Sequence, residues 1–232
     1  MSLFSEKHHA FVSATFYRII KENGFHDYRT AFRMAVRLYA QQRGSRMAQR
    51  ALRDGRPLDF ASYRYYGEWE YTPGALAAMP RHFESVAEGC DVKMIVHSCP
   101  WKDQYYEMGL PDGALDYCAD LDCSIARGFN PELAFEVGQT LMQEGNEFCV
   151  LYQREANIGA ESAYGPRNPE NIMCWSFHCG HVYKTFSDVF TAVYGEKGAE
   201  ASGKAIAAFA EAYGDDMAQS LAGFKAHDFS YI

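Results

Sequence analysis

The chain has 232 residues, 48% of them hydrophobic and 22% charged, which is typical of a soluble globular protein. Its formal net charge of −8 argues against nucleic acid as the main partner, and no Lys/Arg cluster with interleaved aromatic residues is present. No apolar run is long enough to span a membrane, and the N-terminus lacks the apolar core of a signal peptide. The seven cysteines follow no disulfide-scaffold pattern, so we expect reduced thiols in a cytoplasmic protein.

The N-terminal part of the chain is predicted to be helical. Apolar residues at three- and four-residue spacing predict a helix over 8–23 and a longer helix over 27–54. Gly44 lies inside the longer helix, where a neighbouring helix can pack closely. The aromatic-rich segment after Leu58 favours a short helix that leads into a strand near 69–72.

Two pairs of extended runs, each joined by a glycine-containing turn, are predicted to form antiparallel β-hairpins. They are 83–87 with 92–98, joined at Glu88-Gly89, and 133–141 with 148–153, joined at Glu144-Gly145-Asn146. A helix is expected over 101–108, between the two hairpins.

The stretch between the hairpins also carries the main chemical signal. Pro111-Asp112 begins a helix that is expected to continue to Gly128. One face of this helix would present Leu115, Cys118, Asp122 and Ile125. A carboxylate on an apolar face needs a partner or a shifted pKa, so Asp122 beside Cys118 marks a candidate site. The alternative is that Cys118 is a small buried hydrophobe and Asp122 lies at the helix edge.

Two more helices, over 178–194 and 199–224, are predicted after a polar loop. The fold class is therefore α+β: an antiparallel sheet with packed helices, flanked by N- and C-terminal helix pairs. No linker divides the chain, so we expect a single domain over 1–232. Its parts would be a helical segment (1–66), a sheet-and-helix core (67–155), and a loop with C-terminal helices (156–232).

A thiol nucleophile is the first chemistry that these residues favour, with Cys118 and Cys149 near Asn130. A thiol must be activated by a base or by a lowered pKa. His97, at the end of a predicted strand, is the nearest candidate base; the alternative is a structural histidine at a strand terminus. We expect Cys118, Asp122 and Cys149 to converge on one pocket between the central helix and the sheet.

Metal binding is the second chemistry to consider. Soft or borderline ligands are concentrated in one short segment: Cys174, His178, Cys179 and His181. This segment lacks the paired cysteines of structural zinc sites. A sulfur cluster of Cys99, Cys118 and Cys123 is a further alternative. We therefore expect no cofactor, with zinc as the alternative. Since His178 and His181 share one helical face, we expect their helix to pack over the thiol pocket.

The chain resembles the L-2-amino-thiazoline-4-carboxylic acid hydrolase family over about residues 95–215. The resembling pieces are Tyr117-Cys118, Asp122, Gly128-Phe129-Asn130-Pro131, Leu133, Thr140-Leu141, Gly145, Cys149, the segment from His178 to Tyr183, and Gly195-Glu196-Lys197-Gly198. The resemblance implies a hydrolase that opens a small cyclic amidine or isothiourea carrying a carboxylate. The resemblance then implies one set of residues that brings about attack on the amidine-like ring carbon and another set that binds the carboxylate.

Two mechanisms are open for such a hydrolase. Cys118 attacks with His97 or Asp122 as the proton carrier, or water attacks with Asp122 as the base while Cys118 lines the pocket. The residues expected to bind substrate are Asn130, Cys149, His178, His181 and Arg127. The cation for a substrate carboxylate is expected among Arg127, Arg154 and Arg167.

Two other functions fit the same residues. One is a non-catalytic protein that binds or senses a small molecule, in which thiols and aromatic side chains line a ligand pocket. The other is an enzyme of the same scaffold with an unrelated substrate. The expected partner in every case is a small molecule, with no nucleic acid and no membrane, and a homo-oligomer is possible.

Overall fold

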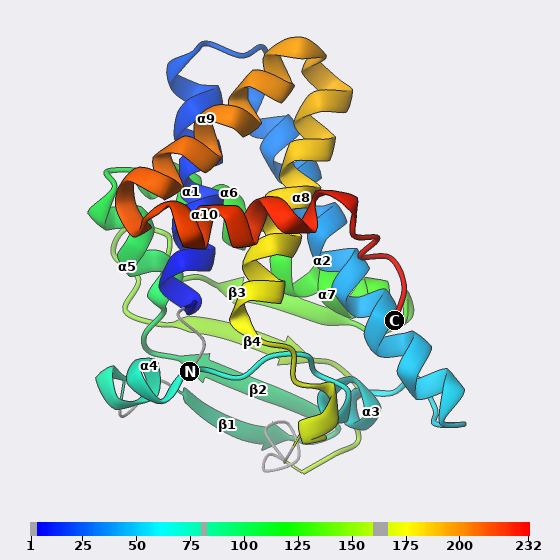
Figure 1. Ribbon diagram of the computed structural model, residues 1–232. Coiled ribbons are helices and arrows are strands. Elements are labelled where there is room, and N and C mark those ends of the chain that lie inside the picture. The colour runs from blue at the N-terminus through cyan, green and yellow to red at the C-terminus, as the bar shows by residue number, and fades with distance from the viewer. Residues whose placement is uncertain (1–3, 80–82, 160–166) are drawn as a thin grey trace. The chain divides into compact units, whose positions relative to one another are not determined.

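The computed structural model describes residues 4–79, 83–159 and 167–232. The chain forms two compact units, each assembled from segments that are distant in the sequence (Figure 1). The helical unit consists of Met1–Tyr39, Pro100–Tyr117 and Cys174–Asp228, and the sheet unit of Ala40–Cys99, Cys118–Met173 and Phe229–Ile232. The chain passes repeatedly between the two units. The single domain expected over 1–232 stays a prediction.

The helical unit is built from helices. They are α1 (Glu6–Glu22), the first part of α2 (Tyr28–Arg53), α5 (Pro100–Glu107), α6 (Pro111–Cys118), α8 (Trp175–Tyr194), α9 (Glu196–Tyr213), α10 (Asp215–Ala222) and the 3-10 helix η3 (Gly223–Ala226). α1 packs against α5, α8 and α9. Phe16 of α1 contacts both Phe186 and Phe190 of α8, with ring centroids 5.6 and 5.5 Å away. These buried aromatic rings form the apolar core of the unit.

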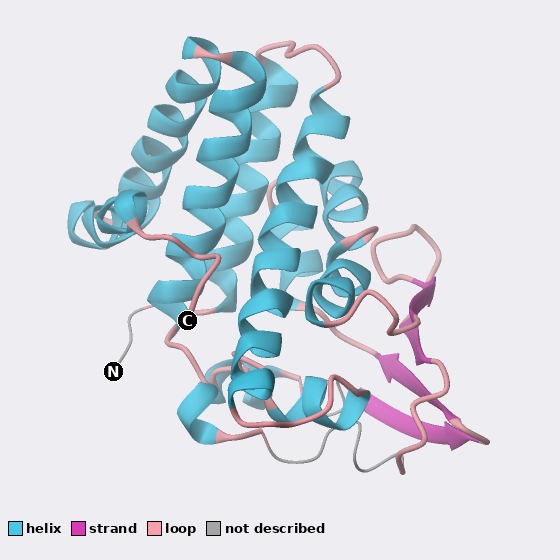
Figure 2. Cartoon of the chain, turned by 90° about the vertical axis from the view of Figure 1, so that its right-hand side faces the viewer, coloured by secondary structure: helices cyan, strands magenta, loops and turns pink. Residues whose placement is uncertain are grey.

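The sheet unit holds all four strands of the described chain (Figure 2). Its elements are the end of α2, α3 (Phe60–Tyr65), α4 (Pro73–Ala78), β1 (Phe83–Glu88), β2 (Asp91–Val96), α7 (Leu121–Phe129), β3 (Phe135–Gln139), β4 (Cys149–Gln153) and the 3-10 helix η2 (Pro169–Asn171). The strand order is β1-β2-β4-β3, and every pair is antiparallel. Both predicted hairpins are confirmed, and so is the α+β class.

The close approach expected at Gly44 is present between α2 and α7. A Cβ added at Gly44 would lie 2.0 Å from the carbonyl oxygen of Ile125. The contact is reciprocal, because a Cβ at Gly128 would lie 2.3 Å from the carbonyl oxygen of Gln41. Two glycines thus allow the backbones of these helices to touch, and they fix where α7 lies against α2.

Three predicted elements are wrong in detail. The continuous helix from Pro111 to Gly128 is two helices, because α6 ends at Cys118 and α7 begins at Leu121 after the Asp120 cap. No strand forms at 69–72, where Thr72 caps α4 by accepting the backbone N–H of Ala75 at 3.3 Å. The last helix is interrupted at Gly214, whose φ of 92° ends α9 before α10 begins.

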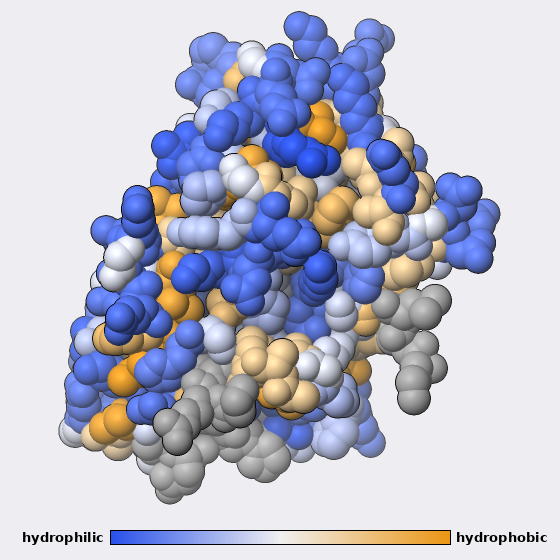
Figure 3. Space-filling model, turned by 90° about the vertical axis from the view of Figure 1, so that its left-hand side faces the viewer, coloured by the Kyte–Doolittle hydropathy of each residue, from blue (hydrophilic) through white to orange (hydrophobic). Residues whose placement is uncertain are grey.

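The face drawn in Figure 3 is mostly hydrophilic, with smaller apolar areas between the polar side chains. None of the helices in the described ranges is both long and apolar enough to cross a membrane.

Candidate functional site

Cys118 and Cys149 meet at one hydroxyl group in the sheet unit. Cys118 is the last residue of α6 and Cys149 the first of β4. The hydroxyl of Thr140 donates to Cys118 Sγ at 3.2 Å, and Cys149 Sγ lies 3.9 Å from the same oxygen. Cys149 Sγ also accepts the backbone N–H of Leu141 at 3.1 Å. The β3–β4 loop therefore holds the two thiols in one place.

Thr140 is a residue of this site that the sequence reading did not include among its functional residues. Its hydroxyl is itself fixed, because the oxygen accepts the backbone N–H of Met142 at 3.1 Å. The available signal was the Thr140-Leu141 pair, which belongs to the resembling pieces. Without the hairpin geometry, nothing in the spacing connects Thr140 to Cys118.

The Cys118 thiol is held in its protonated form. Burial raises its pKa well above the ordinary range, and the neighbouring charge of Asp122 raises it further. The hydrogen bond from Thr140 acts in the opposite direction and does not overcome burial. At neutral pH the thiolate is therefore a minor form, which weakens Cys118 as a nucleophile.

Asp122 lies in the first turn of α7, and the pKa of its carboxyl group is raised. Burial raises the pKa of its carboxyl group, and the positive charge of Arg43 lowers it by less. A carboxyl group whose pKa moves toward neutrality can accept and return a proton at physiological pH.

Tyr63 lies near Asp122, Arg43 and Arg167, whose charges act on its hydroxyl group. Burial raises the pKa of Tyr63, and so does the charge of Asp122, whereas Arg43 and Arg167 lower it. Both guanidinium groups also lie by the ring of Trp69, with Cζ atoms 5.8 Å (Arg43) and 5.5 Å (Arg167) from the ring centroid. The acid, the phenol and two arginines therefore form one neighbourhood within the sheet unit.

The other predicted residues of the sheet unit have identifiable local contacts. His97 Nε2 lies 3.0 Å from Glu84 Oε1, and its ring lies 5.9 Å from that of Phe148. Asn130 donates to the carbonyl of Leu58 at 2.9 Å and accepts the N–H of Glu132 at 3.0 Å. Both contacts of Asn130 are to backbone at the end of α7. Its role in substrate binding, like that of His97 in catalysis, stays a prediction.

Arg127 and Arg154 lie in different surroundings from Arg43. Arg127 is exposed in the last turn of α7. Arg154 pairs with Asp91 at 2.9 Å and with Glu136 at 2.7 Å, and its guanidinium lies over the ring of Tyr152. Two carboxylates thus already balance the charge of Arg154.

His178 and His181 belong to the helical unit, in the first half of α8, and are almost fully buried. The ring of His178 contacts Trp175, and the ring of His181 contacts Tyr39 at a centroid distance of 4.5 Å. His9 joins both aromatic residues, with ring centroids 6.2 Å from Trp175 and 5.3 Å from Tyr39. The predicted packing of α8 over the thiol pocket stays a prediction.

The protonation of His9 follows from its partners. The indole N–H of Trp101 can only donate, and it donates to His9 Nδ1 at 3.0 Å. His9 is therefore neutral, carries its proton on Nε2, and donates it to the hydroxyl of Tyr39 at 2.9 Å. The sequence reading missed His9, because a lone histidine on an apolar helical face gives no distinctive signal.

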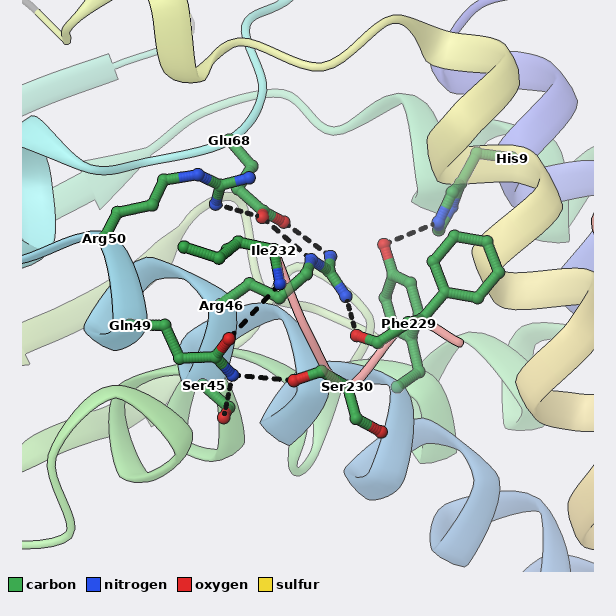
Figure 4. A network of polar contacts seen from close by, with 10 residues as sticks. His9, Ser45, Arg46, Gln49, Arg50, Glu68, Phe229, Ser230 and Ile232 are labelled. Carbon is green, nitrogen blue, oxygen red and sulfur yellow. Dashed lines mark hydrogen bonds and ion pairs between the residues drawn. The ribbon is translucent and has the colours of Figure 1, made fainter. Parts of the chain in front are cut away.

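A buried ionic cluster in the sheet unit was also missed (Figure 4). Glu68 is fully buried and accepts from Arg46 at 2.6 and 2.9 Å and from Arg50 at 2.6 Å. Arg46 also donates to the carbonyl of Phe229. Arginines at three- and four-residue spacing along a helix usually form a solvated face, but Arg46 and Arg50 are buried. Both guanidinium groups pair with the Glu68 carboxylate inside the unit, and buried charges require such partners.

No group of three or more His, Cys, Asp and Glu side chains is placed to hold a metal ion within residues 4–79, 83–159 and 167–232. Cys174 is exposed and Cys179 is buried, although they are close in sequence. The expectation of no cofactor, with zinc as the alternative, stays a prediction.

Comparison with known proteins gives one match. A family model described as L-2-amino-thiazoline-4-carboxylic acid hydrolase matches residues 5–152. The match begins far N-terminal to the segment of the resemblance, includes Cys118, Asp122 and Cys149, and ends before His178. Among curated proteins and among solved structures, none matches the chain. Since the match covers well over half of the sequence, the chain belongs to the L-2-amino-thiazoline-4-carboxylic acid hydrolase family.

Proposed function

We propose that the protein hydrolyses the ring of a small cyclic amidine or isothiourea that carries a carboxylate, with Asp122 as the general base. The family name supports a hydrolase. The single observation that supports the role of Asp122 is its raised pKa next to a thiol that is held protonated. Of the two groups, the carboxyl is the one with a pKa suited to moving protons near neutral pH.

The reacting carbon, C2 of a thiazoline, is bonded to two nitrogens and one sulfur. Water adds to C2 as Asp122 takes one of its protons, and the electron pair of the C=N bond moves to nitrogen, which receives that proton. The tetrahedral carbon then forms its carbonyl while the bond to ring sulfur or ring nitrogen breaks. Asp122 carries the hydroxyl proton to the leaving atom. One water is added overall, and a free thiol or a free amine results.

Attack by Cys118 is the competing mechanism. It needs a thiolate, which burial and the charge of Asp122 both disfavour. Cys118 is also the last residue of α6, so the negative end of that helix dipole gives a thiolate no stabilisation. These effects favour attack by water, with Cys118, Cys149 and Thr140 lining the site.

The decisive experiment is turnover of 2-amino-thiazoline-4-carboxylate, followed by mass spectrometry for the addition of one water. A thiol reagent then separates C–S from C–N cleavage. We expect Asp122→Asn to lower kcat by about 10²–10⁴-fold, while Cys118→Ser keeps kcat within about tenfold because the thiol is not consumed in the reaction. Asp103→Asn and Cys90→Ser, both exposed, are the matched controls.

The outcomes separate the alternatives. Loss of turnover in Cys118→Ser with retention in Asp122→Asn would establish thiolate attack and overturn the role of Asp122. A wild-type protein that does not turn over the thiazoline but is stabilised by it against thermal unfolding would be a binding or sensing protein.

The pH dependence gives an independent test of Asp122. The base must be deprotonated, so kcat/KM rises with pH through the raised pKa of Asp122. The charge of Arg43 lowers this pKa, so Arg43→Gln raises it and moves the acid limb of the profile to higher pH. An acid limb that does not move would show that Asp122 is not the titrating base.

A further inference from the structure

We propose that the sheet unit carries a peptide-binding groove along the last part of α2, and that the segment Phe229–Ile232 is its tethered occupant. The ligand class is an extended peptide with a phenylalanine anchor. The segment belongs to the sheet unit, whereas the chain before it, up to Asp228, belongs to the helical unit. Residues 225–228, which lead to the groove, are all exposed.

One face of α2 forms the groove. Its residues are three and four positions apart, so they share that face: Gln42, Ser45, Arg46 and Gln49. Gln49 contacts two backbone groups of the segment (Figure 4). Its Nε2 donates to the carbonyl of Ser230 at 2.7 Å, and its Oε1 accepts the N–H of Ile232 at 3.2 Å. A side-chain amide that donates to one peptide group and accepts from another recognises backbone rather than side chains.

Arg46 is oriented toward a further backbone group of the segment. Its Nε and Nη2 donate to the two carboxylate oxygens of Glu68 at 2.9 and 2.6 Å, and its Nη1 donates to the carbonyl of Phe229. The guanidinium is planar, so the two bonds to Glu68 also fix the direction of Nη1. The buried ionic cluster therefore holds a donor in place for the peptide.

The exposure of the segment indicates which of its side chains the groove selects. Phe229 is 2% exposed, and its ring centroid lies 5.9 Å from Cζ of Arg46, which is within the range of a cation–π contact. Tyr231 and Ile232 are 68% and 50% exposed. Because backbone hydrogen bonds supply affinity and buried side chains supply specificity, we expect the groove to require phenylalanine and to accept changes at Tyr231.

The test is binding of a fluorescein-labelled peptide, Asp-Phe-Ser-Tyr-Ile, followed by fluorescence polarisation. In the wild type the tethered segment competes at a high effective concentration, so the peptide should bind weakly. Phe229→Ala removes the anchor of the tethered segment, and this full-length variant should bind the peptide about tenfold or more tighter than wild type. Tyr231→Ala is the control, because it keeps the anchor and should bind as wild type.

Changes in the groove and in the peptide locate the site. Added to Phe229→Ala, the change Gln49→Ala should weaken binding of the peptide by about fivefold or more, since two hydrogen bonds are lost. Gln41→Ala, at an exposed glutamine of the same helix, should leave binding unchanged. A peptide with alanine in place of phenylalanine should bind about tenfold or more weaker.

A second measurement does not depend on the folding of Phe229→Ala, which circular dichroism checks. In otherwise wild-type protein, Gln49→Ala removes the acceptor of the Ile232 N–H, and should raise the hydrogen-exchange rate of this amide by about fivefold or more. Gln41→Ala should leave that rate unchanged.

The proposal is overturned if the peptide binds wild type and Phe229→Ala equally, if it binds neither, or if its phenylalanine can be replaced without loss. Exchange of the Ile232 amide that does not respond to Gln49→Ala would also overturn it. None of these measurements involves turnover of the thiazoline, so their failure is distinct from failure of the proposed hydrolase.

Discussion

Replacement of Gly44 by alanine perturbs the contact that sets α7, and with it Asp122, against α2. The added Cβ would lie 2.0 Å from the carbonyl oxygen of Ile125 and 2.6 Å from the amide nitrogen of Phe129. Both neighbours are backbone atoms, which cannot turn away as a flexible side chain can. Since ordinary contact begins at 3.4 Å, the helices would have to separate by about 1.4 Å at this point.

The energetic cost follows from two opposing effects. Alanine is favoured over glycine inside a helix by about 0.5–1 kcal/mol. Overpacking costs about 1–3 kcal/mol, and rigid backbone neighbours place this contact at the upper end. We therefore expect Gly44→Ala to lower the free energy of unfolding by about 2 kcal/mol, which corresponds to a decrease in Tm of about 4–8 °C.

Urea unfolding followed by circular dichroism measures this change. Gly203→Ala is the matched control, since its helical position in α9 has nothing within 4 Å and the same substitution should there be neutral or stabilising. The double variant with Gly128→Ala should cost less than the sum of the single changes, because the helices need to separate only once. A Gly44→Ala protein as stable as wild type would refute the close packing of α2 on α7.

Three buried groups give further measurable outcomes. Burial raises the pKa of Asp122, so the wild-type free energy of unfolding falls as pH rises from the ordinary pKa of Asp through the raised one. Asp122→Asn should therefore stabilise the protein at neutral pH but not in acid. Equal effects of the substitution at both pH values would contradict this reasoning. Glu68→Ala leaves Arg46 buried without its carboxylate, and should cost about 3–5 kcal/mol in urea unfolding, whereas a loss below about 1 kcal/mol would be inconsistent with the ionic cluster. Trp101→Phe removes the N–H donated to His9 and should cost about 1 kcal/mol, measured by thermal unfolding, and an unchanged Tm would contradict this hydrogen bond.

Local patterns were sufficient to predict the types of most elements. Alternation and turn residues gave both hairpins, because the two-residue period of a strand and the positive φ of Gly89 and Gly145 are properties of the local chain. The three- and four-residue spacing gave α1 and α2 in the same way. The sequence also predicted close packing at Gly44, because glycine destabilises a helix interior and its presence there indicates contact with another segment.

The sequence by itself determined the α+β class, the hairpins, and Cys118, Asp122 and Cys149 as residues that require explanation. Only the tertiary structure decided that the central helix breaks after Cys118 and that Thr140 joins the two thiols. It also decided that Arg43, rather than an exposed arginine, acts on Asp122. The physical reason is the range of the interactions: periodicity and turn preferences act over a few residues, whereas desolvation and the charge of Arg43 act through space between segments that are distant in the sequence.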